Sequence, residues 1–276
     1  MIYTKQPEVN LITWTHEPVK AIALAVHAWT SDNFPDSLEE ISDDEAQVLA
    51  KKALKAFHKT ALEYVDTVWV IKNCSRAFQQ QLTRTRLASF SIQSMRVVTK
   101  AGFATAGHYT MPPHLNDEQK EIFHQSMLRI EREYDELIAS GAPVEDARSM
   151  LPLNIHSDIS FRININALYH MLGQRLCVNT QWEYRQVAAQ IKREVQKKLD
   201  PMLSEVIDAP CVRIKKCPMR DEYCGIPVWR NTEEEKMDIY NKYVSFKKVD
   251  NKWDIKWLND DKPNFIQMNN LAVEIE

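Results

Sequence analysis

The chain has 276 residues, of which 44% are hydrophobic and 26% are charged, as in an ordinary globular protein. Its formal net charge of −3 gives no reason to expect nucleic acid or an anionic membrane as a partner. No apolar run reaches the roughly 18–20 residues of a membrane span, and no signal-peptide core follows the first residues. The five cysteines are an odd number, which fits a reducing compartment better than a disulfide framework. We therefore expect a cytoplasmic protein.

Glycine is scarce, with 5 residues in the whole chain, and no G-x-G-x-x-G motif is present, which disfavours a glycine-rich dinucleotide-binding fold. Strand and helix patterns alternate irregularly, which predicts an α+β fold rather than a parallel sheet of βαβ units. In chain order we expect strands near 8–13, 65–71 and 155–165, helices near 21–29, 44–57, 75–83, 116–140, 166–175 and 180–199, and a loop over 31–43. The apolar face of the helix near 44–57 would consist of Ala46, Leu49, Ala53, Leu54 and Phe57.

The segment from residue 84 to residue 96 concentrates arginine and serine without any aspartate, glutamate or lysine. Guanidinium forks and small hydroxyl groups are suited to phosphate oxygens, so this segment could hold a phosphorylated ligand. Ser94 and Arg96 are two residues apart and would share a face if the segment were extended. The alternative is a surface turn with solvated arginines.

Three shorter patterns flank this segment. His58, Thr60 and Glu63 precede a strand, where Thr60 and Glu63 could equally form a helix capping box. Gln81 lies three residues before Arg84 and shares a helix face with it; alternatively, it is a solvent-facing glutamine. Glu145 and Arg148 are also three apart, so their alternative is an ordinary surface pair on one helix.

A fourth group of polar residues interrupts the apolar segment that follows the last strand. Its members are Asn164, Asn166, His170 and Arg175. Buried polar groups need partners, so a ligand is one explanation, although a lone helix histidine is more often part of the core or the surface. Beyond them, Thr180 and Glu183 predict a capping box for the helix near 180–199.

Cys211, Cys217 and Cys224 form a cluster near the end of the chain. Three thiolates could bind zinc if a fourth ligand joined them. The spacing lacks the usual C-x2-C pair, so we favour ordinary thiols and predict no metal site.

The pattern Arg-x-Arg-x7-Ser, made by Arg84, Arg86 and Ser94, resembles the signature of the flavin-dependent thymidylate synthases, also called thymidylate synthase complementing proteins. In that family the pattern is usually Arg-His-Arg-x7-Ser. The flanking patterns are similar to further family motifs and occur in the same order. They are His-x-Thr-x-x-Glu, the glutamine before the signature, Glu-x-x-Arg followed by Leu-Pro, and Gln-Trp-Glu-x-Arg, over residues 58–185.

The resemblance implies an α+β fold with a mixed sheet and long helices, assembled as a homotetramer whose active sites draw on several subunits. It implies a catalytic domain over 1–205 and a C-terminal extension over 206–276. The implied reaction converts dUMP to dTMP, with methylenetetrahydrofolate as the carbon donor, FAD as the cofactor and NADPH as the reductant. Neither nucleic acid nor a membrane is implied as a partner.

The resemblance also implies roles for individual residues. The residues expected on FAD are His58, Thr60, Glu63, Arg84, Thr85, Arg86, Asn164, Asn166 and His170. The residues expected on dUMP are Gln81, Arg84, Ser94, Arg96, Arg148 and Arg175. Of these, Arg175 and Ser94 are the candidate catalytic residues. No base that could activate Ser94 as a nucleophile is visible in the sequence, so we assign it to nucleotide binding.

The chain departs from the family pattern at several of these positions. The departures are Thr85 in place of histidine, Ile92 in place of an acid, Met95 in place of glycine, Val97 in place of tyrosine, Asn166 in place of arginine and His170 in place of asparagine. They leave open an enzyme that acts on another pyrimidine nucleotide, such as dCMP, or transfers hydroxymethyl instead of methyl. Divergent viral members of the family make this alternative relevant, and such a protein would act in the host cytoplasm. A further alternative is an oligomer that binds nucleotide without turnover.

Overall fold

The computed structural model describes residues 2–214, 244–249 and 252–257. The chain divides into two compact units, Met1–Ala167 and Leu168–Glu276. None of the helices in the described residues is both long enough and apolar enough to cross a membrane.

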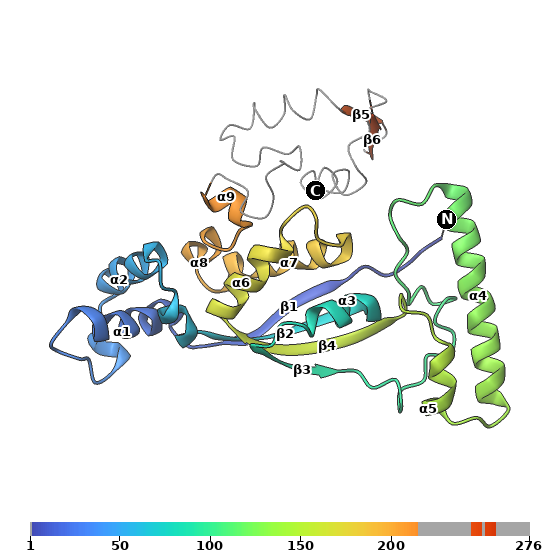
Figure 1. The fold of residues 1–276 in the computed structure, drawn as a ribbon, viewed down its shortest axis with the longest axis horizontal. Helices are drawn as coiled ribbons and strands as arrows, with labels where there is room; N and C mark the ends of the chain where they lie inside the picture. The colour runs from blue at the N-terminus through green and yellow to red at the C-terminus, as the bar shows by residue number, and fades with distance from the viewer. Residues whose placement is uncertain (1, 215–243, 250–251, 258–276) are drawn as a thin grey trace. The chain divides into compact units, whose positions relative to one another are not determined.

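The first unit is built on a four-stranded sheet with the order β1-β2-β4-β3 (Figure 1). Its strands are β1 (Glu8–Trp14), β2 (Asp66–Ser75), β3 (Ala88–Ile92) and β4 (His156–Asn164). The combination of this sheet with helices confirms the α+β class. All three strand pairs are antiparallel, so the expectation of a mixed sheet was wrong. A sequence pattern identifies strands but not their directions, because long connections can return the chain either way.

Aromatic side chains from three neighbouring strands form the centre of the sheet. Trp69 of β2 pairs with Phe161 of β4, which pairs in turn with Phe90 of β3. The Phe161 ring lies 6.2 Å from the Trp69 ring and 6.1 Å from the Phe90 ring, centroid to centroid. Cross-strand aromatic pairs of this kind fix the register of a sheet, because a one-residue slip would turn each ring to the opposite face.

Strand β2 changes register near its end, where it leads into the short helix α3 (Arg76–Leu82). The pairing with β4 shifts between Ile71 and Cys74, and Asn73 has a φ of 55°. The carboxylate of Asp158 accepts a hydrogen bond of 3.0 Å from the Asn73 backbone N–H. Ser75 then caps α3 by accepting from the Phe78 N–H at 2.9 Å. This irregular end of the strand directs the first turn of α3.

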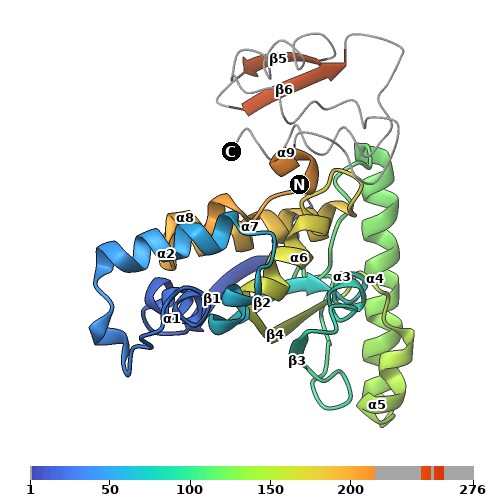
Figure 2. The ribbon, with the colours of Figure 1, turned by 60° about the vertical axis from the view of Figure 1, so that its left-hand side comes forward.

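Two helices lie at one end of the sheet, as Figures 1 and 2 show. They are α1 (Pro18–Thr30) and α2 (Asp43–Lys55), with a short 3-10 turn, η1 (Leu38–Glu40), between them. Ser42 caps α2 by accepting from Glu45 N–H at 3.3 Å. Since α2 ends at Lys55, Phe57 lies beyond it with 93% of its surface exposed. The prediction that Phe57 extends the apolar face of this helix was therefore wrong.

The long helix α4 (Asp117–Ala139) stands beyond the other end of the sheet (Figure 2). Asn116 and Gln119 form a reciprocal capping box at its start, in which each side chain satisfies a backbone N–H of the other residue. Gly141 follows its end with a φ of 94°, a conformation that favours glycine. Met127 and Tyr134 bury the inner face of this helix, and the prediction of a helix near 116–140 is confirmed.

The second unit contains most of α6 (Ile165–Arg175), together with α7 (Trp182–Lys198), α8 (Pro201–Glu205) and α9 (Pro210–Ile214). It also includes an antiparallel pair, β5 (Val244–Val249) and β6 (Lys252–Trp257). The cap of α7 is Gln181, whose side chain accepts from the Tyr184 N–H at 3.0 Å. The predicted capping box was therefore wrong, because the Thr180 hydroxyl donates to the Gln174 carbonyl instead.

Arg185 closes the connection between α6 and α7. Its buried guanidinium donates to the carbonyl oxygens of Val178 and Thr180 at 2.8 and 3.3 Å. Burial lowers the pKa of this guanidinium from its usual range. The arginine of the Gln-Trp-Glu-x-Arg motif therefore holds this connection through Nη1, whereas its buried Nε and Nη2 have no hydrogen-bond partner among the described residues.

Candidate active site

A cavity of about 420 Å³ lies in the first unit, among α3, the segment after β3 and the turn before β4. Two residues expected on a nucleotide, Ser94 and Arg148, line it together. They come from separate motifs, so this proximity is not a consequence of their spacing in the sequence. Arg76, Gln80 and Gln93 line the same cavity and give it a polar, positively charged character.

Helix α3 supplies the first two of these additional residues. Arg76 and Gln80 are four apart and therefore share a helix face. The buried Gln79 between them faces the core, where its Nε2 donates to the Ser157 carbonyl at 2.7 Å. The Gln79 Oε1 accepts a hydrogen bond of 2.9 Å from Arg76 Nη1, so the core glutamine orients the arginine.

The sequence motifs did not identify Arg76 and Gln80, because the resemblance to the family pointed to Gln81 on the same helix. Gln81 is half-buried and is not among the residues that line the cavity. The signal that could have identified the cavity face was the run of three glutamines on one short helix. Gln79 and Gln80, three and four residues after Arg76, lie on its side of the helix, whereas Gln81 at five residues does not.

Ser94 lies in a turn rather than in a strand, because β3 ends at Ile92. The Val98 N–H donates to the Ser94 carbonyl at 3.1 Å, and the Arg96 N–H donates to the Ser94 hydroxyl at 3.2 Å. The expectation that Ser94 and Arg96 share a face of an extended segment was therefore wrong. Since the Ser94 oxygen accepts from the backbone, its own hydrogen remains available to an acceptor in the cavity.

Arg96 forms a two-point ion pair with Glu145, which lies on α5 (Val144–Ala147). The distances are 2.7 Å from Nε to Oε1 and 2.9 Å from Nη2 to Oε2. Hydrogen bonding to Arg96 lowers the pKa of Glu145, and the same contact raises the pKa of Arg96. Both side chains are exposed, so solvent screens the pair.

This ion pair corrects the interpretation of Glu145 and Arg148 as partners on one helix. α5 ends before Arg148, which begins the 3-10 turn η3 (Arg148–Met150). Arg148 Nε donates to the backbone carbonyl of Glu145 at 3.1 Å. No carboxylate pairs with the Arg148 guanidinium within the described part of the chain, so its remaining donors are available to a ligand.

Arg84, Thr85 and Arg86 form the turn between α3 and β3. Backbone hydrogen bonds from Arg84 to Gln81 and from Thr85 to Leu82 measure 3.3 and 3.0 Å. Arg84 and Arg86 are exposed, and neither forms an ion pair within residues 2–214. The signature therefore presents two guanidinium groups without an anionic partner in the described chain.

Glu63 and Asn166, both expected on the flavin, are brought together. Glu63 lies in the 3-10 turn η2 (Thr60–Tyr64), and its Oε1 accepts a hydrogen bond of 2.8 Å from Asn166 Nδ2. Lys59 begins this turn without a side-chain cap, so the capping box of Thr60 and Glu63 was wrong. Asn166 Oδ1 is buried and has no hydrogen-bond partner among the described residues.

The other residues expected on the flavin in the first unit differ in their contacts. Asn164 Oδ1 accepts from the Ala167 N–H at 2.8 Å and so caps the start of α6. Thr60 and His58 are exposed, and the His58 ring lies edge-on to Phe57 at 5.2 Å.

His170 and Arg175 belong to the second unit, where both contact aromatic rings. The His170 ring lies 5.0 Å from the Tyr169 ring, centroid to centroid. The Arg175 guanidinium lies over the Tyr184 ring at 4.6 Å, a cation–π geometry that leaves the edge donors of the guanidinium free to bind a ligand.

Comparison with known proteins identifies the family. Residues 10–201 match the family described as thymidylate synthase complementing protein. This chain belongs to that family. A flavin-dependent thymidylate synthase of Nitratidesulfovibrio vulgaris is 32% identical over 237 residues, covering 80% of this chain and 95% of that protein. Another, from Pyrococcus abyssi, is 28% identical over 244 residues, covering 85% and 98%.

Among solved structures, thymidylate synthase X from Helicobacter pylori, determined with FAD and dUMP, matches with a TM-score of 0.59. The match covers 72% of this chain and 99% of that one at 19% identity. This likeness supports the fold, since the identity is too low to carry residue roles.

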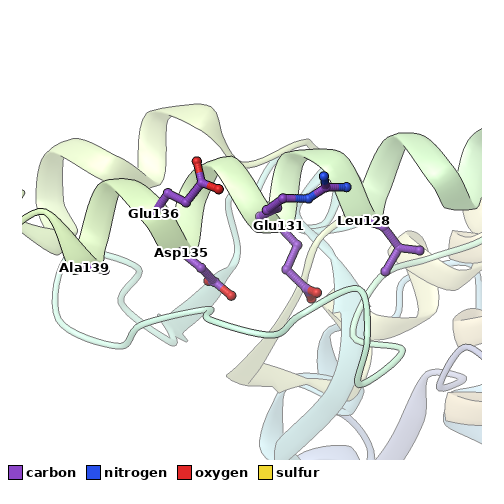
Figure 3. Close-up of a pocket in the computed structure, with 6 residues that line it drawn as sticks. Leu128, Glu131, Asp135, Glu136 and Ala139 are labelled. Atoms are coloured by element: carbon purple, nitrogen blue, oxygen red, sulfur yellow. The ribbon is translucent and has the colours of Figure 1, made fainter.

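A second hollow, of about 560 Å³, lies along α4 (Figure 3). The buried Glu131 and the neighbouring Asp135 extend from the helix toward the loop before it, as Figure 3 shows. The Glu131 carboxylate accepts from the N–H groups of Ala104 and Thr105 and from the Thr105 hydroxyl, and Asp135 accepts from the Gly102 N–H at 3.3 Å. Both carboxylates hold the loop, and Glu131 uses both of its oxygens to do so. Asp135 bonds through one oxygen only, and its buried Oδ1 has no hydrogen-bond partner among the described residues.

The absence of a metal site stays a prediction. No cluster of three or more potential metal-ligating side chains occurs within the described residues. Cys211 is half-buried at α9, whereas Cys217 and Cys224 lie outside the described residues.

Proposed function

We propose that this family member is a flavin-dependent thymidylate synthase that methylates dUMP to dTMP. Methylenetetrahydrofolate would provide the carbon and NADPH the reducing equivalents. The observation that carries the proposal is the cavity in which Ser94 and Arg148, from two separate family motifs, meet beside Arg76. The two named relatives are flavin-dependent thymidylate synthases, and their similarity extends over most of this chain.

The cavity suits the phosphate of a nucleotide. Arg76 and Arg148 present guanidinium forks, which bind phosphate oxygens through charge-assisted hydrogen bonds. Ser94 can donate its hydroxyl hydrogen, because its oxygen already accepts from the Arg96 N–H. Ser94 is therefore a nucleotide ligand in our proposal rather than a nucleophile. Gln81, Arg84, Arg96 and Arg175 are proposed as further contacts to dUMP, with Arg175 a candidate for the catalytic step.

Flavin binding has a structural rationale at Asn166. Its buried Oδ1 has no hydrogen-bond partner in the described chain, which is costly unless a ligand donor satisfies it. Glu63 holds the Asn166 amide in place. Arg84 and Arg86, which lie close in sequence to the cavity residues, offer guanidinium donors that have no anionic partner in the described chain. These groups fit FAD, which when bound would transfer electrons from NADPH. His58, Thr60, Thr85, Asn164 and His170 remain proposed flavin contacts.

An assembly with shared active sites is part of the proposal. On the single chain, three apolar side chains next to the proposed site residues are strongly exposed: Phe57 at 93%, Leu87 at 73% and Val97 at 79%. Exposed apolar surface of this kind indicates a surface that is covered in the working protein. We propose that a homotetramer covers it, that residues 1–205 form the catalytic domain with 206–276 as an extension, and that the protein works in the cytoplasm.

The test begins with a visible absorption spectrum of the purified protein during titration with FAD, with and without dUMP. We expect a saturable flavin band and, with all co-substrates present, a product about 14 mass units above dUMP, the mass of one CH₂ group. A protein that binds no flavin under either condition would overturn the proposal. Turnover of dCMP instead of dUMP, or a product carrying a hydroxymethyl group, would replace the proposed substrate or product.

A further inference from the structure

Gln93 lines the cavity immediately before Ser94 and was not among the expected site residues. Its backbone is fixed from two sides. The Gln93 N–H donates to the Asp158 carbonyl at 2.9 Å, which continues the β3–β4 ladder past Ile92. The Ser157 hydroxyl donates to the Gln93 carbonyl at 3.4 Å. The side chain therefore starts from a well-defined position on the cavity wall.

The amide of Gln93 is also fixed in its orientation. Lys100 Nζ donates to Gln93 Oε1 at 2.6 Å, and both residues are half-buried. An ammonium group has donors only, so the amide oxygen rather than the amide nitrogen must face it. An unrestrained glutamine can present either an acceptor or donors to a ligand, but this contact leaves only the donors.

The amide nitrogen of Gln93 has no hydrogen-bond partner within residues 2–214. It belongs to a side chain that lines the cavity, so its two N–H groups are available to whatever binds there. A site whose donor is held in place favours a ligand with an acceptor atom at that point, because a ligand donor there would leave both groups unpaired.

We propose that Gln93 is a specificity-determining residue, held by Lys100 so that its Nε2 donates to an acceptor oxygen of the bound pyrimidine nucleotide. This inference rests on the proposed function. The acceptor is either the base carbonyl at position 4, which would select uracil over cytosine because cytosine carries an amino group there, or an oxygen that both nucleotides share, such as the carbonyl at position 2 or a phosphate oxygen. Lys100 acts through Gln93 and is a positioning residue.

The test is calorimetric titration of the FAD-loaded full chain with dUMP and with dCMP. Gln93→Met removes the donor at similar size, and we expect about tenfold weaker dUMP binding, as for one lost hydrogen bond of roughly 1.4 kcal/mol. Gln93→Glu should bind dUMP more weakly still. Its carboxylate gains an ion pair with Lys100 but presents oxygen, not N–H, to an anionic ligand. Gln125→Met, a glutamine on the exposed face of α4, is the matched control and should bind dUMP like the wild type.

The role of Lys100 is tested by a double-mutant cycle. Lys100→Met alone should weaken dUMP binding severalfold, because the amide can then turn, and should add little in a Gln93→Met background. Independent effects of the two substitutions would overturn the positioning role. Circular dichroism of each variant reports whether it is folded, and the folded Gln93→Glu protein keeps the test decisive if Gln93→Met misfolds.

The two nucleotides distinguish the sources of the acceptor. If Gln93→Met weakens dUMP binding and reduces the preference for dUMP over dCMP, the acceptor is the uracil carbonyl at position 4. An equal proportional loss for both assigns it to a shared oxygen. Unchanged dUMP affinity in folded Gln93→Met overturns the inference while leaving the proposed function intact. A wild-type protein that binds neither flavin nor dUMP overturns both.

Discussion

The two hollows of the first unit have similar size and are both lined by charged side chains, yet they differ in what those charges do. Along α4, the carboxylates of Glu131 and Asp135 bind backbone N–H groups of the loop before the helix. In the cavity by α3, the guanidinium groups of Arg76 and Arg148 bond to a core glutamine and a backbone carbonyl. Neither arginine has a carboxylate partner in the described chain.

The difference between Glu131 and these two arginines suggests a criterion for a binding site other than volume, namely how many hydrogen bonds its charged groups already make. A carboxylate that accepts three hydrogen bonds has little capacity left for a ligand. A guanidinium with five donors that makes one or two bonds keeps most of its capacity. We assign the larger of the two hollows to structure because three hydrogen bonds from the loop already occupy its Glu131 carboxylate.

The largest effect is expected from Arg148→Ala. Loss of a charge-assisted contact to phosphate should weaken dUMP binding by roughly tenfold to a hundredfold in calorimetry. The matched control is Arg132→Ala, which removes an arginine that lines the hollow on α4 and should leave dUMP affinity unchanged. Equal losses from both substitutions would indicate general electrostatic attraction and would remove the distinction between the hollows.

The opposite pattern is expected from Glu131→Gln. The variant keeps the shape of the side chain but replaces one of the carboxylate oxygens that accept from Ala104 and Thr105. We expect urea denaturation to show a loss of about 2 kcal/mol in the free energy of unfolding, because a buried hydrogen bond to a charged group is lost. Nucleotide affinity of the folded variant should be unchanged. A stable variant with weakened dUMP binding would reverse our assignment of the two hollows.

The sequence was sufficient where structure depends on neighbouring residues. The stripe of α4, its cap at Asn116 and its end at Gly141 are local signals, and the structure contains that helix as expected. The strands β1, β2 and β4 likewise follow from β-branched and aromatic runs. Local signals failed at Thr60 and Thr180, because a capping pattern shows which hydrogen bond a side chain can form and not which one it forms in the folded protein.

The site was less predictable, because its contacts join distant segments. Arg96 and Glu145 are 49 residues apart, and nothing in the spacing of either motif indicates that they pair. Ser94 and Arg148 were found through resemblance to a family, not through local physics. Arg76, Gln80 and Gln93 had no motif to identify them, and their roles depend on which helix face and which end of β3 border the cavity.

A smaller effect is expected on the pH dependence of stability, because positively charged groups surround a buried histidine beside the cavity. His156, next to the cavity residue Ile155, is buried, with His108, Lys100 and Lys5 contributing positive charge around it. Burial, followed by the charge of these groups, lowers the pKa of His156 to about 3. Between this value and the unfolded pKa of about 6.5, the unfolded chain binds the proton and the folded chain does not.

Stability should therefore fall as pH decreases through that window, by up to about 1.4 kcal/mol per pH unit from this group. His156→Gln removes the titration, so the loss of stability between about pH 7 and pH 5 in chemical denaturation should be smaller than in the wild type. His16→Gln, at an exposed histidine, should leave the slope as it is. Parallel wild-type and His156→Gln slopes would contradict a neutral buried histidine.

The smallest effect is expected from Glu145→Gln. Glu145 occupies the Arg96 guanidinium with two contacts, so Arg96 must exchange this partner if it is to bind dUMP as we propose. Removing the negative charge should make Arg96 available and strengthen dUMP binding by roughly twofold to threefold, while the exposed pair should contribute nothing measurable to the free energy of unfolding. If Glu145→Gln weakens dUMP binding instead, the ion pair positions Arg96 for the nucleotide. Arg96 would then resemble Lys100, because its contact with another protein side chain would fix the geometry of the cavity. It would differ from Arg148, whose guanidinium has no carboxylate partner in the described chain.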